Sequence, residues 1–222
     1  TSIKMFTELL QSASMRLGRK ARAHVRIIDG EAERLGRMVT TILDSARIEQ
    51  GVKEYHPVLT DVRPVVRRAM SAMAFQLSQG KFTIRVVLPR RPAPVFADPD
   101  AVAQALMNVI ANAIKYSAAR KYVAVRVSCR ERRVRVSVTD RGRGIREGSL
   151  PHLFERFYRD PSVALNIEGV GLGLPLVKNI MDGCQGSVEV NSVPGKGSTF
   201  TLVFPPPGEV SGISSSSKEA HA

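Results

Sequence analysis

Apolar residues recur every three or four positions in two series within the first fifty residues of the chain. The first series is Ile3, Phe6, Leu10, Ala13 and Leu17, and the second is Ile28, Ala32, Leu35, Val39, Ile42 and Ala46. This spacing is typical of the seam between packed helices. Because two such helices bury only a narrow core, the pattern predicts an antiparallel helical hairpin over residues 1–50 that dimerises into a four-helix bundle.

Gly51 and the polar, proline-containing stretch after it interrupt this pattern, which predicts a linker over residues 51–60. Asp61 can then cap a helix over residues 62–77 that ends at Gly80, and Asp100 can cap the next helix. Another helix, with Pro175 in its first turn, follows a glycine-rich stretch. Strands are predicted at residues 81–89, 93–98, 186–193 and 197–205, and a hairpin of two strands is predicted within residues 120–140.

Mixed strands and helices without regular alternation predict an α+β class, with a sandwich domain over residues 61–205. The remaining residues, 206–222, are rich in proline and serine, and we expect them to form a disordered tail. A chain of 222 residues with 43% hydrophobic residues can bury one good core. It contains no run of 18 apolar residues that would span a membrane, and no signal peptide is visible.

The two cysteines, Cys129 and Cys184, occupy positions typical of an apolar strand and of a helix end. Their separation does not match the spacing of metal ligands, so we expect reduced side chains that fill the core. This use of cysteine indicates an intracellular compartment.

The net charge of +13 is concentrated in residues 61–150, which contain 18 basic and 6 acidic side chains. Much of it lies in residues 120–140, where arginines alternate with valines and predict a hairpin with one basic and one apolar face. The simplest interpretation is a solvated outer surface of a sheet. A nucleic-acid groove would interleave aromatics with the arginines, and only Tyr122 is nearby, so we expect no nucleic-acid partner. Attraction to anionic lipid or to a carboxylate-rich protein stays open.

The segment "NVIANAIKYS" places polar side chains in a helix that is otherwise suited to burial. At about 100° per residue, Asn108, Asn112 and Lys115 fall on one face of that helix. A carboxamide oxygen can bind a Mg²⁺ ion that keeps its waters and takes its other ligands from phosphates. A lysine can supply a point charge for the same phosphates. The alternative interpretation is ordinary surface polarity.

Two glycine-rich stretches carry further candidate chemistry. In "DRGRGI", Asp140 can accept a hydrogen bond from an exocyclic amine, while Gly142 and Gly144 let the backbone pass close to a flat ring. In "GVGLGLPLVKNI", the backbone amides at Gly169, Gly171 and Gly173 and the start of a helix can face phosphate oxygens. An ordinary turn and a flexible loop are the alternatives. The second stretch does not match a dinucleotide fingerprint, and "PGKGS" lacks the upstream glycine of a P-loop.

These segments together describe a site for a purine nucleoside triphosphate. In this order, residues 108–117, 140–145, 153–159 and 169–180 resemble the N, G1, F and G2 boxes of the ATP-binding domain of sensor histidine kinases. That domain has the Bergerat fold of the GHKL superfamily, which includes gyrase, a heat-shock chaperone and MutL. Residues 1–50 are similar to the dimerisation and phosphotransfer hairpin of the same kinases.

The resemblance implies ATP and Mg²⁺ as cofactors and assigns roles to individual residues. Asn108 is then the catalytic residue that positions the reacting phosphate, and Asn112 coordinates Mg²⁺. Lys115 and Tyr116 contact phosphate and ribose, Asp140 binds the adenine amine, and the glycines anchor a mobile lid. The implied ATP-binding set is Asn108, Asn112, Lys115, Tyr116, Asp140, Gly142, Gly144, Ile145, Phe157, Arg159, Gly169, Gly171, Leu172, Gly173, Leu174 and Thr199.

This sequence departs from the family pattern in two places. The phosphoacceptor histidine of the family precedes the segment that resembles "LTSIK", and here the sequence begins at Thr1. His24, His56, His152 and His221 do not take its place, so we expect a truncated chain that binds nucleotide without phosphorylating itself. The lid "DPSVALNIE" contains no cation, and Arg156 or Arg159 can substitute for one.

The sequence therefore predicts the cytoplasmic catalytic core of a two-component sensor kinase, which transfers the γ-phosphoryl group of Mg-ATP to a histidine and then to a response-regulator aspartate. The expected partners are a second copy of the chain, through the hairpin, and a receiver domain. We expect contact with a membrane only through segments upstream of this chain. An ATP-gated dimer scaffold or a phosphatase-biased regulator is the alternative. An ATPase clamp of the gyrase type would carry an acidic base at position 108, where this chain has asparagine.

Overall fold

The computed structural model describes residues 55–117, 120–164 and 169–209, with scattered positions in the first 54 residues. Those positions are Leu10, Gly18, Ala21, His24, Val25, Ile28, Ala32 and Gly36, all of them helical except Gly18. Two compact units, Thr1–Lys53 and Glu54–Ala222, divide the chain. The rest of the predicted helical hairpin, and the predicted tail beyond residue 209, lie outside the described residues.

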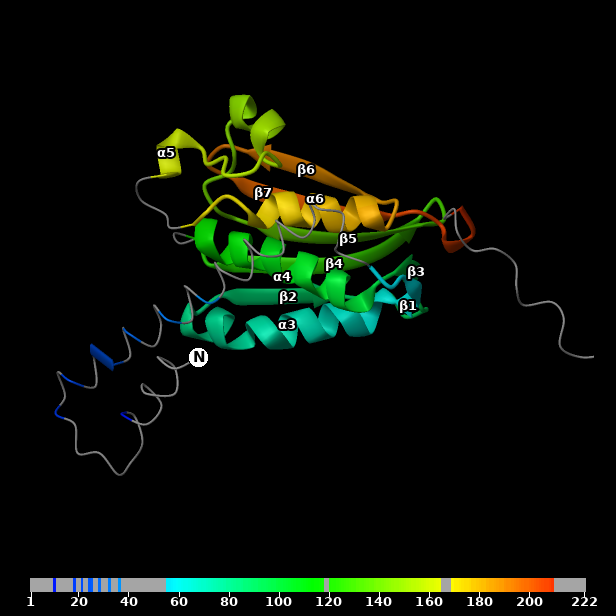
Figure 1. Ribbon diagram of the computed structural model, residues 1–222, viewed down its shortest axis with the longest axis horizontal. Helices are drawn as coiled ribbons and strands as arrows, with labels where there is room; N and C mark the ends of the chain where they lie inside the picture. The colour runs from blue at the N-terminus through cyan, green and yellow to red at the C-terminus, as the bar shows by residue number, and fades with distance from the viewer. Residues whose placement is uncertain are drawn as a thin grey trace, which may run out of the picture. The chain divides into compact units, whose positions relative to one another are not determined.

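The second unit combines helices with a mixed sheet, which confirms the predicted α+β class (Figure 1). Its helices are α3 (Val62–Gln79), α4 (Pro99–Tyr116), α5 (Pro161–Ala164), α6 (Gly173–Gly183) and the 3-10 helices η1 (Glu147–His152) and η2 (Pro207–Glu209). Its strands are β1 (Val58–Asp61), β2 (Thr83–Val87), β3 (Pro94–Ala97), β4 (Tyr122–Arg130), β5 (Arg133–Asp140), β6 (Ser187–Val193) and β7 (Gly197–Phe204). No described helix combines the length and the apolar character needed to cross a membrane.

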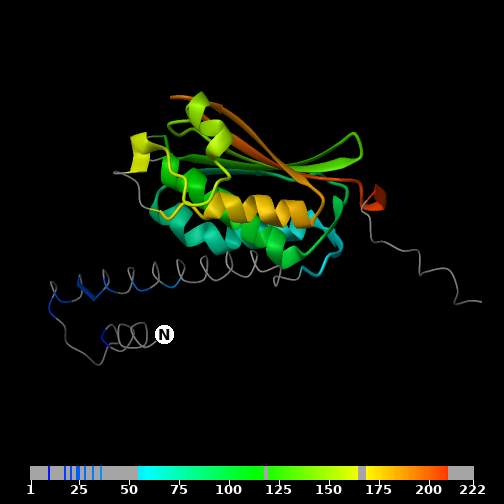
Figure 2. The same cartoon turned by 45° about the horizontal axis from the view of Figure 1, so that its top comes forward.

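Five strands form the main sheet, in the order β2-β4-β5-β7-β6. Only β2 and β4 run parallel, because the chain between them crosses over through β3 and α4, and the other neighbouring pairs are antiparallel. Helices α3, α4 and α6 all lie on one face of this sheet (Figure 2). We call the opposite face of the sheet, which none of these three helices covers, the outer face.

Two short strands, β1 and β3, form a separate antiparallel pair in which Val58 is opposite Ala97. Strand β1 was not predicted, because residues 58–60 fall in the segment assigned to the linker and Asp61 was predicted only as a helix cap. Its exposed Val58 and Leu59 do not alternate with polar residues, so the sequence gives no period-two signal there. At the other end of the unit, Pro207–Glu209 form a helical turn within the segment that was expected to be disordered.

The core lies between the sheet and the three helices. From the β4–β5 hairpin, Val123, Val125, Val127, Val134, Val136 and Val138 are buried, as their alternation predicts. They pack against α4, whose Leu106, Val109 and Ile110 are buried, while the buried Val177, Ile180 and Met181 belong to α6, which packs against α4, β6 and β7. Burial of this kind contributes roughly 1.5–3 kcal/mol for each fully buried aliphatic side chain.

Both cysteines are free thiols, and their environments differ. Cys184 is buried at the end of α6, and burial raises the pKa of its thiol to about 11. The expectation of a second core position was wrong for Cys129, which is exposed. It lies at the end of β4 beside the hairpin turn, where β4 pairs only with β5.

The first residues of the second unit contact both helices that carry the proposed site. The Tyr55 hydroxyl donates a 2.6 Å hydrogen bond to Asn179 Oδ1 of α6. A side chain at Gly183 would come within 2.8 Å of the Tyr55 ring, so the ring lies directly against that glycine. The backbone amide of His56 donates to Asp98 at the start of α4 (3.1 Å).

Helix α4 is capped by Asp98, so the assignment of this cap to Asp100 was wrong. Asp98 Oδ1 accepts hydrogen bonds from the backbone amides of Asp100 (2.8 Å) and Ala101 (3.1 Å). The helix then begins with Pro99, which has no amide hydrogen to leave unsatisfied at the first helical position. Asp100 lies in the first turn and forms an exposed ion pair with Arg68.

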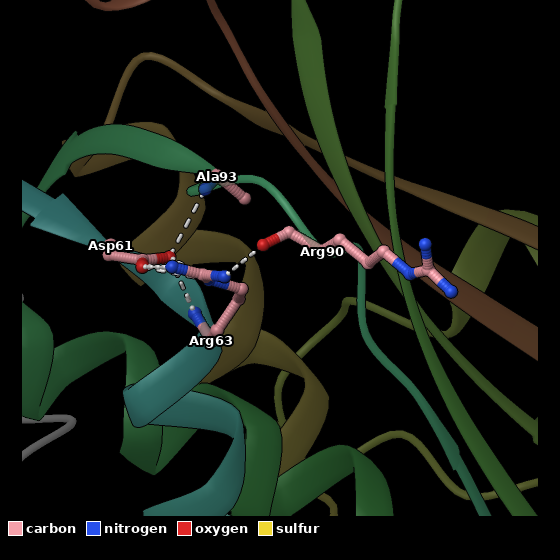
Figure 3. Close-up of polar contacts among 4 residues, drawn as sticks. All are labelled: Asp61, Arg63, Arg90 and Ala93. Carbon is pink, nitrogen blue, oxygen red and sulfur yellow. Dashed lines mark hydrogen bonds and ion pairs between the residues drawn. The ribbon is translucent and has the colours of Figure 1, made fainter.

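Helix α3 begins at a dense polar network centred on Asp61, its N-cap (Figure 3). Asp61 Oδ1 accepts from the backbone amides of Arg63 (3.1 Å) and Ala93 (3.2 Å). The Arg63 guanidinium donates to both carboxylate oxygens and also to the Arg90 carbonyl (2.8 Å). These bonds connect the start of α3 to the loop before β3. Hydrogen bonding from Arg63, the largest influence, holds the pKa of Asp61 at about 2.

Replacing Asp61 with alanine should lower the free energy of unfolding at pH 7 by about 1–2 kcal/mol, because the helix loses its cap. The pKa of Asp61 is lower in the folded chain than its ordinary value of 3.8. Its contribution is therefore complete above that value and is lost as the pH falls toward 2. Urea unfolding should show a smaller difference between wild type and Asp61→Ala at pH 3 than at pH 7.

The matched control for this prediction is Asp100→Ala, which removes only the exposed ion pair with Arg68. We expect it to change stability by less than about 0.5 kcal/mol. Equal losses in the two variants would contradict the role assigned to Asp61.

Candidate functional site

Helix α4 presents its polar side chains along one face, as the sequence predicts. Asn108, Asn112 and Lys115 are half-buried. The other side of the helix is buried in the core through Ala101, Val102, Ala103, Ala105, Leu106, Val109, Ile110 and Ala113. The apolar side therefore fixes the rotation of the helix and directs the three polar side chains away from the sheet.

The glycine-rich segment before α6 lies against this polar face. A side chain at Gly169 would collide with Lys115 Nζ, and a Cβ atom at Gly173 would lie 3.1 Å from Asn108 Oδ1. Asn108 Nδ2 donates to the Gln104 carbonyl (2.9 Å), and this bond fixes the orientation of the carboxamide. The structure therefore brings Asn108 and Lys115 together with the segment 169–173.

Asp140 lies beside the C-terminal end of α4. Its Oδ1 atom accepts from the backbone amides of Gly142 (2.7 Å) and Ser198 (3.3 Å). Burial is the largest influence on this carboxyl and raises its pKa, while the two amide hydrogen bonds act in the opposite direction. The buried Ser117 hydroxyl also lowers the pKa, although it makes no hydrogen bond of regular geometry with a described residue. Asp140 is thus a largely dehydrated acceptor.

The fold itself requires the glycines after Asp140, and their expected role of making room for a flat ring stays a prediction. A Cβ atom at Gly142 would collide with the Tyr116 carbonyl oxygen. Gly144 has φ +69°, and its Cβ atom would collide with the Val193 carbonyl oxygen. The amide of Arg143 donates to the Tyr116 carbonyl (3.2 Å), and Ile145 donates to Ser192 Oγ (2.8 Å). The loop is therefore held between the end of α4 and the end of β6.

Segment 153–159 reaches the site through its backbone. Phe157 is 65% exposed with φ +62°, and its amide donates to the Gly171 carbonyl (3.0 Å). Burial raises the pKa of the Tyr116 hydroxyl, and the positive charges of Arg159 and Arg143 oppose this effect. Arg159 and Arg143 are thus close enough to act on the C-terminal end of α4. Lys115 Nζ lies 5.1 Å from the centroid of the Tyr116 ring.

Asp160 is a polar centre that the sequence analysis did not identify. It accepts from Arg146 Nη2 (2.6 Å), Ser149 Oγ (2.7 Å) and the amide (2.8 Å) and hydroxyl (2.6 Å) of Ser162. Arg146 is the largest influence that holds the pKa of Asp160 far below its usual range. Through these bonds Asp160 fixes η1 relative to the segment that contains Phe157 and Arg159. The sequence signal was the Asp-Pro-Ser triplet, which is typical of a helix start.

Thr199 and Leu172 differ in position from the rest of the expected ATP-binding set, because the first lies on the outer face of the sheet and the second lies in the core. Thr199 is opposite Thr139 in the β5–β7 pair, and their hydroxyls are 3.0 Å apart. Because Asp140 follows Thr139 on the same strand, Thr199 points to the outer face while Asp140 points toward the helices. The assignment of Thr199 to the site was therefore wrong, and Ser198 is the neighbour of Asp140. Leu172 is 3% exposed and belongs to the core, whereas Leu174 is half-buried.

Neither glycine-rich segment contributes a metal-binding cluster. The described residues contain no group of three or more histidine, cysteine, aspartate or glutamate side chains that could hold a metal ion. Asn108 and Asn112 provide carboxamide oxygens on the polar face of α4. Such a donor set suits a hard cation that takes its other ligands from phosphate and water.

Comparison with known proteins gives matches along nearly the whole chain. Residues 97–208 match the family model described as histidine kinase-, DNA gyrase B-, and HSP90-like ATPase. Residues 1–51 match the model of the His Kinase A (phospho-acceptor) domain.

Two similar curated proteins come from Mycobacterium tuberculosis. The sensor-like histidine kinase SenX3 is 34% identical over 176 residues, which cover 79% of this chain and 43% of SenX3. The sensor histidine kinase MtrB is 31% identical over 206 residues, or 92% of this chain and 36% of MtrB. The chain thus spans less than half the length of either relative. Among solved structures, full-length ShkA in complex with AMPPNP is 25% identical, with a TM-score of 0.74 over 91% of this chain and 42% of ShkA.

Because a Cβ atom at Gly144 would collide with Val193, we expect a single added methyl group there to cause a large loss of stability. Gly144→Ala should destabilise the second unit by at least about 2 kcal/mol, because alanine is strained at positive φ and the loop would also have to shift. Gly148→Ala is the matched control, since nothing lies within 4 Å of its Cβ position. Thermal unfolding should separate the two variants clearly. A Gly144→Ala variant as stable as Gly148→Ala would show that the loop adapts freely.

Proposed function

The chain belongs to the histidine kinase-, DNA gyrase B- and HSP90-like ATPase family, and from this premise we propose that it is the catalytic core of a two-component sensor histidine kinase. In this proposal the second unit binds Mg-ATP. The γ-phosphoryl group then passes to a histidine outside this chain and from there to an aspartate of a response regulator.

The observation that carries the proposal is the arrangement along α4. Asn108 and Lys115 face the segment 169–173, and Asp140 lies at the C-terminal end of the same helix. A triphosphate needs cationic and amide donors, and an adenine amine needs an acceptor, so one extended ligand can satisfy these groups together. The ShkA structure, which is similar over most of this chain, is a complex with AMPPNP, and this supports the assignment to a nucleotide.

The residues on the polar face fit a magnesium-bound triphosphate. Asn112 offers one oxygen donor, which matches the few protein ligands that Mg²⁺ takes when phosphates supply the others. When bound, Mg²⁺ neutralises charge that develops on the phosphates. Lys115 adds a positive charge beside Gly169, and the first amides of α6 present their hydrogens at Gly173. Asn108, oriented by its bond to Gln104, positions the reacting phosphate.

Asp140 is the residue that we assign to base recognition. Both backbone donors bond to Oδ1, so Oδ2 is the oxygen that accepts from the exocyclic amine. Because the carboxyl is buried, a hydrogen bond there is stronger than one exposed to water. Phe157, Arg159, Ile145 and Leu174 complete the proposed nucleotide site.

The remaining parts of the proposal concern the first unit and the partners. The match to the phospho-acceptor domain supports dimerisation through residues 1–50 and a receiver domain as the recipient of the phosphoryl group. SenX3 and MtrB are named as sensor kinases, and this supports a place for this chain on the cytoplasmic side of a membrane-anchored sensor.

We expect Asn112→Ala and Asp140→Ala each to weaken Mg-ATP binding at least tenfold, or about 1.4 kcal/mol. The first variant loses the metal ligand and the second loses the acceptor for the amine. Calorimetric titration of the folded variants measures both effects. Thr199→Val is the control, because its side chain lies on the outer face of the sheet. Loss of affinity in Thr199→Val alone, with the other two unchanged, would contradict the proposed site.

The location of the phosphoacceptor is tested separately with γ-labelled ATP. The chain should remain unlabelled after incubation with Mg-ATP, because none of its four histidines resembles the phosphoacceptor. Acid-labile, alkali-stable phosphohistidine on this chain would show that the acceptor lies within it. Failure of nucleotide binding in the preceding titration would instead refute the site, so the two results are distinguishable.

A further inference from the structure

The outer face of the main sheet carries a group of arginines. We define the arginine face as Arg85, Arg126, Arg130, Arg132, Arg133 and Arg135. Strand register places these residues on β2, β4 and β5 and in the turn between β4 and β5. Val123, Val125 and Val127 point into the core, so Arg126 and Arg130, at alternate positions of β4, point outward. Arg126 is opposite Ser137, which makes it a diagonal neighbour of Arg135.

Acidic side chains balance this face only in part. Glu189 of β6 pairs with Arg135, and Glu131 lies 3.6 Å from Arg130 with both side chains 81% exposed. Arg85, Arg126 and Arg133 are exposed and form no ion pair with any residue that the structure describes. The arginine face therefore has an excess of positive charge directed at solvent.

The turn between β4 and β5 contains charged residues at positions where uncharged residues or glycine would be more favourable. Arg130 is directly opposite Arg133, and like charges in that position destabilise a strand pair. Glu131 and Arg132 form the two-residue turn with φ +53° and +62°, where asparagine and glycine are strongly favoured. Sequences that break several local rules at one place typically do so for function. The turn is therefore a candidate contact surface.

The residues beside the arginines indicate which class of molecule the arginine face can bind. Nucleic acid would need aromatic rings for base stacking, and the nearby Tyr122 ring is covered by Arg141, whose guanidinium carbon lies 4.2 Å from its centroid. A protein partner would need large apolar side chains at the centre of the contact, and the neighbours here are Ala124, Ser128, Ser137 and Thr139. A layer of lipid phosphates requires neither aromatic rings nor large apolar side chains. An open, positively charged sheet surface therefore suits it.

We propose that the arginine face binds the surface of a bilayer that contains anionic phospholipid. Arginines near such a surface are attracted to it over roughly a Debye length, which is about 10 Å at 0.1 M salt. Because α4 and α6 cover the opposite face of the sheet, this contact leaves the proposed nucleotide site directed away from the membrane (Figure 2). The contact is independent of the proposed kinase function.

Co-sedimentation of the whole chain with lipid vesicles tests this proposal. At 0.1 M NaCl the chain should bind vesicles of phosphatidylglycerol and phosphatidylcholine in equal parts and should not bind phosphatidylcholine alone. Arg126→Glu with Arg133→Glu should reduce the partition coefficient at least tenfold. The control, Arg67→Glu with Arg91→Glu, makes the same change in net charge at two exposed residues outside the arginine face and should retain most of the binding.

A second variant separates a binding role from a structural role. Arg132→Gly removes one charge and also relieves the positive φ, so its midpoint of thermal unfolding should rise while vesicle binding falls. A fall in both would assign Arg132 to the fold and count against the proposal. Equal loss of binding in the two charge-reversal pairs, equal binding to neutral vesicles, or no binding at all would overturn it. Displacement from vesicles by single-stranded nucleic acid at equal phosphate concentration would also overturn it, in favour of a nucleic-acid partner.

Discussion

Burial of the apolar side of α4 against the sheet is the constraint on which the candidate site depends. The helix has one apolar side, so its rotation about its own axis is determined once that side is buried. Asn108 and Lys115 then face the segment that leads into α6. Helix α6 packs beside α4 through its own apolar residues, Leu176, Val177 and Ile180, and this packing brings Gly173 to Asn108. The polar arrangement thus follows from the apolar one.

Much of this organisation was predictable because the local signals agree with the final packing. The valine alternation predicts the β4–β5 hairpin, and the face shared by Asn108 and Lys115 follows from helical period alone. The cap of α3 was also predicted correctly, because Asp61 directly precedes the helix and aspartate is a favoured N-cap residue. Prediction failed where two signals compete within a few residues. Asp98 and Asp100 flank Pro99, and only the proline, which favours the first helical position, identifies Asp98 as the cap.

Other features depend on register or on distant contacts, which a single sequence does not reveal. Whether Ser198 or Thr199 meets Asp140 is decided by the pairing of β7 with β5, since a shift of one residue exchanges the two faces. The role of Asp160 depends on Arg146 and Ser149, which reach it from another turn of the chain. Strand β1 forms only because β3 is available to pair with it. The cofactor roles of the individual side chains stay predictions.

The close contacts of Gly142 and Gly144 have a consequence for engineering. The loop after Asp140 fits between the Tyr116 carbonyl at the end of α4 and the Val193 carbonyl at the end of β6, with no space for an added methyl group on either side. A redesign for a different base that alters only the recognition carboxylate would keep these supports intact. Transplanting the loop into another scaffold would require both flanking backbone segments to move with it as a single unit.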